Sequence, residues 1–179
     1  DAAMCLTSVA TRLGDRAGLV VFDRQVRALV PPGTGRHQLT RINEAMFSLE
    51  PSLAESDYLG AFTATLARFR RRALLVVLTD LVAQPVSDSL LPALPLMVRS
   101  HLVVVAAVSD PEISRWAAAS PVDEAEAYLA AAATDALDQR RRITARLRAA
   151  GALVIDAPVG RLAPELADAY LDLKAEGRL

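Results

Sequence analysis

The sequence predicts an α/β fold with a doubly wound, mostly parallel sheet and an antiparallel hairpin at its edge. Two runs, Ala73 to Leu78 and Leu102 to Val108, have strand length and are apolar at every position. Such runs are typical of parallel strands covered by helices on both faces. Helical patterns alternate with strands from Ala73 onward, and a hairpin pattern lies near the start. The 179 residues, 53% of them hydrophobic, suffice for one compact domain over residues 1–179.

The elements follow one another with turn and cap signals between them. Pro31-Pro32-Gly33 breaks the chain after the hairpin, and Ala83-Gln84-Pro85 has the pattern of a loop. Ser87 or Asp88 is the expected cap of the helix that follows this loop, and Ser56-Asp57 offers an N-cap for the helix from Tyr58. Asp156 to Gly160 is expected to form a turn. Helices are expected at Ala2 to Leu13, His37 to Leu49, Tyr58 to Phe69, about Ser87 to Arg99, Glu112 to Ala119, Asp123 to Ala150 and Leu162 to Ala175, and strands at Ala17 to Phe22, Gln25 to Val30, Ala73 to Leu78, His101 to Val108 and Ala152 to Ile155.

The strand from Ala73 to Leu78 ends on two small oxygen-bearing residues, Thr79 and Asp80. In open α/β sheets, ligands bind at the carboxyl edge of the strands. Two interpretations stay open here. Either the pair belongs to a metal site, or Asp80 caps the next segment and holds a loop through backbone N–H groups.

Composition argues against several classes of function. The formal net charge is -1 and only 4% of residues are aromatic, so nucleic-acid binding is not indicated. No apolar run approaches the ~20 residues that cross a bilayer. The single Cys5 is expected to be a small buried thiol, and the lone Trp116 a packing residue. The sequence has no nucleophile elbow, Cys/His cluster or dinucleotide fingerprint, which favours a protein that is not an enzyme.

Five segments carry a resemblance that covers essentially the whole chain. They are Gly14 to Asp23, Val30 to Arg36, Leu74 to Leu81, His101 to Val105 and Tyr170 to Leu179. With them, the chain resembles the carboxyl-terminal two-thirds of a protein of the domain-of-unknown-function family 58, a bacterial family related to the von Willebrand factor A (vWA) domain. The resemblance implies a three-layer, Rossmann-like sheet whose first, central strand would lie upstream of Asp1. The expectation is a single vWA-like domain, truncated at its amino-terminal side.

The resemblance also implies half of a metal site. vWA domains often hold Mg²⁺ in a metal-ion-dependent adhesion site, built from an Asp-x-Ser-x-Ser motif, a Thr and an Asp on three loops, and hard oxygen ligands suit this ion. Carried over to this chain, the Asp is Asp80 with Thr79 in support, and the hydroxyl position falls near Ser56, with Asp57 beside it. The first motif is absent from the sequence. We therefore expect no cofactor held by this chain alone, and Mg²⁺ in the full-length protein.

The expected function is that of a non-catalytic protein-interaction module. The resemblance implies a protein partner, a MoxR-type AAA+ ATPase, and a role in complex assembly or chaperone-like work. It also implies a cytoplasmic domain whose full-length protein is anchored to the inner membrane. The alternative is a metal-assisted hydrolase of the doubly wound type that uses Asp80, Asp110 and Asp23 near the carboxyl edge of the sheet. No nucleophile or base accompanies these acids, which favours the module.

Overall fold

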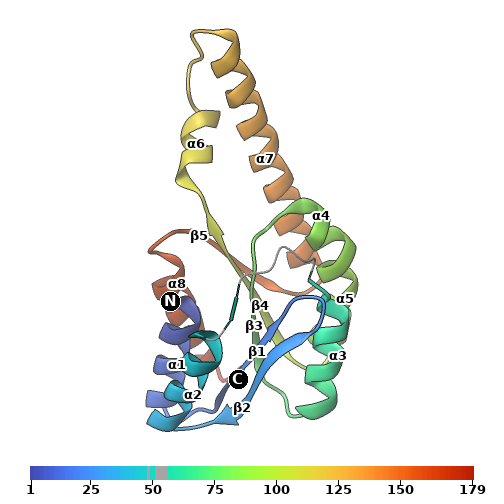
Figure 1. The fold of residues 1–179 in the computed structure, drawn as a ribbon, viewed down its shortest axis with the longest axis vertical. Helices are drawn as coiled ribbons and strands as arrows, with labels where there is room; N and C mark the ends of the chain where they lie inside the picture. Colours follow the sequence, from blue (N-terminus) through green and yellow to red (C-terminus); the bar gives the residue numbers. More distant parts are fainter. Residues whose placement is uncertain (48, 51–55) are drawn as a thin grey trace.

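The computed structural model describes residues 1–47, 49–50 and 56–179, and has the predicted α/β class (Figure 1). The strands are β1 (Ala17–Phe22), β2 (Val26–Gly33), β3 (Leu74–Leu78), β4 (Leu102–Ser109) and β5 (Leu153–Pro158). The helices are α1 (Ala2–Arg12), α2 (Arg36–Phe47), α3 (Tyr58–Arg68), α4 (Ala83–Pro85), α5 (Leu91–Val98), α6 (Pro111–Ala117), α7 (Glu124–Ala149) and α8 (Leu162–Ala175), and a π-helical turn, η1 (Val86–Leu90), joins α4 to α5. None of the described helices is both long and apolar enough to span a membrane.

Strand β4 is the centre of a parallel sheet, with β3 on one side and β5 on the other. Its side chains alternate between two cores, as the period of a strand requires. Val103, Val105 and Ala107 pack with residues of α3, α5 and α7, whereas Val104 and Ala106 pack with residues of α1 and α8. Helices therefore cover both faces of this sheet, which is the doubly wound arrangement that the continuous apolar runs predict.

The hairpin differs from the prediction. Strands β1 and β2 pair antiparallel, with Val20 opposite Leu29, but they form a sheet of their own and are not an edge of the parallel sheet. Strand β2 also runs through the Pro31-Pro32-Gly33 stretch that the sequence assigns to a break. Proline is tolerated there because the pairing with β1 shifts register between Ala17 and Leu19, opposite the two prolines, and because the other edge of β2 pairs with no described strand.

The helix expected from Ser87 begins earlier, at Ala83. Its N-cap is Val82, and the chain stays helical through α4, η1 and α5 to Val98. The loop predicted at residues 83–85 is therefore wrong. Pro85 lies in the first turn, where backbone N–H groups have no partner within the helix, so a residue without an N–H costs nothing there.

Three further expectations need correction. Strand β5 continues past Ile155 to Pro158, so Asp156 lies in the strand and not in a turn. Trp116 is 40% exposed on α6 and is not a packing residue. Cys5 is half-buried, not enclosed.

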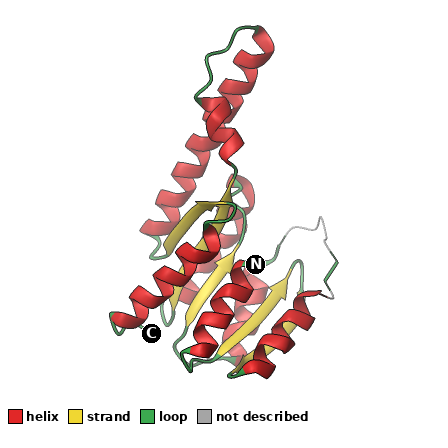
Figure 2. Ribbon diagram, turned by 90° about the vertical axis from the view of Figure 1, so that its left-hand side faces the viewer, coloured by secondary structure: helices red, strands yellow, loops and turns green. Residues whose placement is uncertain are grey.

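A helical hairpin projects from the body of the molecule (Figures 1 and 2). Its long member is α7, whose 26 residues span about 39 Å at the helical rise. Arg140 fixes its base: the guanidinium donates to both carboxylate oxygens of Asp156 in β5, at 2.8 and 2.7 Å, and to the Val108 carbonyl of β4 at 2.8 Å. The hairpin therefore rises from the carboxyl edge of the parallel sheet.

Candidate functional site

The structure brings together two of the stretches that the sequence proposes for a site. The hydroxyl of Thr79, just after β3, lies 2.6 Å from the hydroxyl of Tyr58, the first residue of α3. Ser56 is two residues before Tyr58, so the loop before α3 and the end of β3 are neighbours. The Thr79 N–H also donates to the Ala106 carbonyl at 3.1 Å, which fixes the Thr79 backbone against β4.

Tyr58 is a site residue that the sequence reasoning missed. Its ring is buried and makes edge-to-face contacts with Phe22 and Phe62, at centroid distances of 5.3 and 5.8 Å. Burial raises the pKa of the Tyr58 phenol, the hydrogen bond with Thr79 opposes this rise, and the charge of Asp80 adds to it. The phenol is therefore protonated at neutral pH and holds the Thr79 hydroxyl in place. Its only sequence signal is an aromatic residue directly after a cap, which does not distinguish it from an ordinary core residue.

Asp80 is exposed, and no side chain or backbone N–H that the structure describes bonds to its carboxylate. The helix after it is capped at Val82 without a side-chain hydrogen bond. The capping interpretation of Asp80 is therefore not what the structure shows. Asp110, at the end of β4, gives the contrast, because its carboxylate accepts the Glu112 N–H at 2.8 Å and caps α6.

Asp57 serves as the N-cap of α3, as the sequence predicts. Its carboxylate accepts the Gly60 N–H at 2.9 Å, and its own N–H donates to the Asp23 carbonyl at 2.8 Å. Ser56 is half-buried, and its carbonyl accepts the Ser89 hydroxyl at 3.2 Å. Ser56 lines a hollow of about 490 Å³ with Asp57, Asp88 and others.

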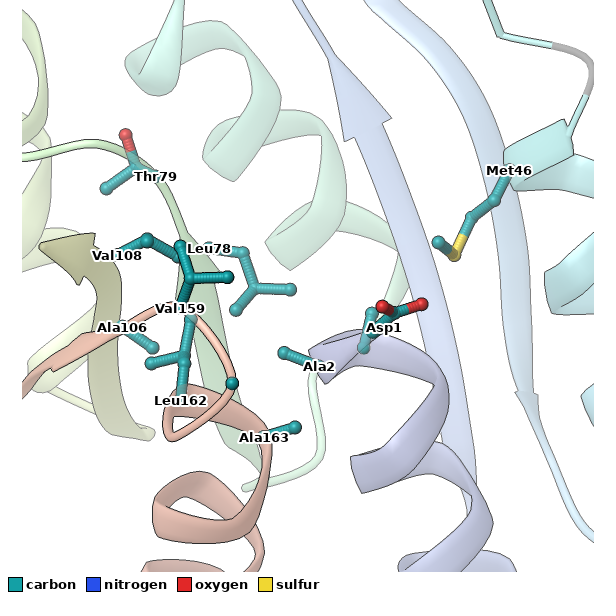
Figure 3. Close-up of a pocket in the computed structure, with 12 residues that line it drawn as sticks. Asp1, Ala2, Met46, Leu78, Thr79, Ala106, Val108, Val159, Leu162 and Ala163 are labelled. Atoms are coloured by element: carbon teal, nitrogen blue, oxygen red, sulfur yellow. The ribbon is translucent and has the colours of Figure 1, made fainter. Parts of the chain in front are cut away.

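Thr79 lines a different hollow, of about 390 Å³ (Figure 3). Its walls are mainly small and apolar, with Leu78 and Thr79 on one side and Asp1 at the start of α1 on another. Ser56, proposed as a ligand, and Thr79, proposed in support, therefore line separate hollows.

Within residues 1–47, 49–50 and 56–179, no group of three or more His, Cys, Asp or Glu side chains is placed to hold a metal ion. The Thr79 hydroxyl is bonded to Tyr58, and the Asp80 carboxylate has no bonded partner among the described residues. Mg²⁺ prefers six oxygen ligands in near-octahedral geometry, and one carboxylate supplies too few of them.

The acids of the hydrolase alternative are engaged in local structure. Asp23 accepts the Gln25 N–H at 3.1 Å and the Arg27 guanidinium at 2.8 Å, and the pKa of its carboxyl is lowered, first by the Gln25 hydrogen bond and also by Arg27. Asp110 caps α6. Both carboxylates thus accept local hydrogen bonds from the described residues.

One edge of β3 carries unpaired backbone groups beside Asp80. The Leu102 N–H donates to the Ala73 carbonyl and the Thr79 N–H to the Ala106 carbonyl, both at 3.1 Å. Because the backbone groups of a strand alternate in direction, those of Leu75 and Val77 also point to β4. The N–H and C=O groups of Leu74, Val76 and Leu78 therefore point to the opposite edge, where no strand among the described residues is bonded.

Comparison with known proteins identifies one family. A family model described as a protein of unknown function, DUF58, matches residues 1–149. This range runs from the start of α1 to the end of α7 and includes Ser56, Thr79 and Asp80. No curated protein and no solved structure matches the chain. The chain belongs to the DUF58 family.

Proposed function

We propose that the chain is a vWA-like, non-catalytic protein-interaction module that binds its partner at the carboxyl end of β3. One observation carries this proposal: the free edge of β3 ends at a carboxylate, Asp80, that has no partner among the described residues. The unpaired edge of β3 and the carboxylate of Asp80 lie side by side, are suited to binding a partner and have no evident structural role. Open strand edges are recognised by added strands in many protein complexes.

The strand order supports the vWA-like part of the proposal. The two sheets have the orders β1-β2 and β3-β4-β5, and β1 packs against α3, the helix that also packs beside β3 and β4. One additional strand between β1 and β3 would join them into a continuous sheet with the hairpin as its antiparallel edge. This is the sheet that the resemblance implies, with its central strand supplied by a segment other than the described ones.

The cofactor and the partner enter as further parts of this proposal. Mg²⁺ would bind where an Asp-x-Ser-x-Ser motif on the added strand supplies the oxygen ligands that Asp80 lacks here. The partner is a MoxR-type AAA+ ATPase, and the role is in complex assembly beside the inner membrane. These two assignments rest on the family resemblance drawn from the sequence.

A designed extension tests the added strand. An apolar strand ending in Asp-x-Ser-x-Ser is joined ahead of Asp1, which is well placed because Asp1 lines the same hollow as Leu78 and Thr79. We expect Tm to rise by about 4–8 °C or more, since pairing β3 adds backbone hydrogen bonds and apolar burial. A control extension of the same composition, interrupted by prolines, should leave Tm unchanged. Equal Tm values for the two extensions would refute the strand.

Partner binding tests Asp80 itself. Isothermal titration of the extended chain with the MoxR-type ATPase, in the presence of Mg²⁺, should show affinity that falls at least about tenfold in Asp80→Ala. The matched control is Asp168→Ala, which removes an exposed carboxylate on α8, away from the end of β3. Retained affinity in Asp80→Ala, or an equal loss in both variants, would contradict the proposed role of Asp80.

A further inference from the structure

The projecting hairpin, residues 110–139, which we call the arm, has a charge unlike the rest of the chain. Its acids are Asp110, Glu112, Asp123, Glu124, Glu126, Asp135 and Asp138, and its one base is Arg115. The arm therefore carries a formal net charge of -6, whereas the whole chain carries -1. The arm is a concentrated negative field on an otherwise net positive molecule.

The arm also exposes large apolar side chains. Val122 and Tyr128 expose 86% and 79% of their surface. Trp116 and Leu129, also in the arm, are about 40% exposed. Apolar side chains of this size are normally packed, and aromatic residues in particular are enriched where proteins bind one another. Four such side chains on one projecting hairpin indicate an interaction surface.

The tip of the arm is held in one shape. The Asp123 carboxylate accepts the Glu126 N–H at 2.8 Å, and the Glu126 carboxylate accepts the Val122 N–H at 3.0 Å. These reciprocal bonds fix the loop and the first turn of α7, which carry Val122 and Tyr128. A preorganised tip loses little conformational entropy when it binds.

Charge and exposure together define the partner. We infer that the arm docks on a protein surface that has an apolar cleft bordered by basic side chains. A net charge of -6 repels the phosphates of nucleic acids and of anionic lipids, so neither of these surfaces suits the arm. The acids of the arm raise the rate of association with a basic protein surface, and the apolar cleft of that surface binds Val122 and Tyr128. This inference does not depend on Asp80 or on an added strand.

Defined peptide probes test this docking. The intact chain is titrated with three fluorescent amphipathic peptides: one with Lys on one face and Leu on the other, one with Lys and Ser, and one with Glu and Leu. We expect the Lys–Leu peptide to bind at least about tenfold more tightly than either of the others. Its affinity should also fall between roughly 50 mM and roughly 300 mM salt. Equal binding of the Lys–Ser peptide, or no binding of the Lys–Leu peptide, overturns the inference.

Variants locate the binding on the arm. Val122→Ser with Tyr128→Ser should weaken Lys–Leu binding about tenfold, and Glu112→Lys with Glu124→Lys should do the same through charge. The matched controls on α8, Leu171→Ser and Glu165→Lys, should bind as the unchanged chain does, since they remove an exposed apolar residue and an acid elsewhere. Circular dichroism confirms that each variant is folded. Binding that persists in the arm variants overturns the inference.

Other occupants give distinct results. Sedimentation velocity tests a second copy of this chain, whose exposed arginines at positions 68 and 70–72 are the alternative basic surface. Self-association that the arm variants abolish assigns the arm to a second copy and overturns the inference of a separate partner. Binding to duplex DNA or to vesicles of phosphatidylserine, lost in the same variants, overturns it in favour of those surfaces.

Discussion

Strands β3 and β4 are both uninterrupted apolar strands of one parallel sheet, yet they are buried to very different extents. Residues Val103 to Ala107 of β4 expose 1% of their surface or less, whereas Leu78 of β3 exposes 44% and most of β3 is half-buried. Strand β4 has a hydrogen-bonded neighbour on each side, and β3 has one on a single side. Strand β3 has the uninterrupted apolar sequence of a buried strand but is only half-buried, so its unpaired edge is the place where the described sheet is incomplete.

The strongest test of this contrast exchanges neighbouring residues of β3 for proline. Val77→Pro removes an N–H that points to β4 and leaves a buried carbonyl unbonded, whereas the N–H lost in Val76→Pro points to the free edge. We expect Val77→Pro to be the more destabilising by about 1–3 kcal/mol, because an unsatisfied buried acceptor has roughly that cost. Urea unfolding measures the difference. Equal losses would show that both edges of β3 are paired.

The sequence predicts each apolar strand and nearly every helix, because local periodicity and cap residues carry that information. Helix α8 begins at Leu162 and ends at Ala175, as predicted, and Asp57 caps α3. The start of the helix at Ala83 was missed because Pro85 suggests a loop unless its place in the first turn is known. Local sequence patterns do not predict the gap between the two sheets, because the gap depends on whether the edges of β1 and β3 pair in the folded chain.

The site was predictable to a smaller degree. Thr79 and Asp80 stand out in the sequence as polar residues at the end of a buried strand, and the structure leaves Asp80 free. Tyr58 did not stand out, because its role comes from a contact with Thr79 across 21 positions of the chain. Asp110 and Asp80 follow similar strands, but in the structure only Asp110 caps the helix after it.

A smaller effect compares the two strands at their side chains. Val105 in β4 is fully buried, and Val105→Ala should cost about 2–3 kcal/mol, from the lost methyl groups and the cavity that they leave. Val76 of β3 is half-buried, so Val76→Ala should cost about 1 kcal/mol or less. Differential scanning calorimetry and urea titration compare the variants. Equal costs would mean that β3 is as enclosed as β4.

The smallest expected effect concerns His101, which joins the two strands at their amino ends. Its Nδ1 accepts the Ala73 N–H at 3.2 Å, which requires the neutral ring, and burial lowers the pKa of its imidazole below the usual 6.5. The unfolded chain therefore binds the proton more tightly than the folded one. Stability should be full above about pH 7.5 and fall as the pH drops through about 6.5, until the folded imidazole is protonated too.

The midpoint of urea unfolding at about pH 7.5 and about pH 5.5 measures this dependence, in a range where the carboxylates stay ionised. His101→Gln has no titrating ring, so its unfolding midpoint should lose the part of the pH dependence that His101 supplies. A midpoint in the unchanged chain that rises on acidification would reverse the sign and contradict a neutral His101. Because this bond fixes β3 to β4 at one end, its loss should loosen β3, the strand with one neighbour, before β4. Hydrogen exchange at Leu75 and Val105 reports that order, and faster exchange at Val105 would remove the distinction between the two strands.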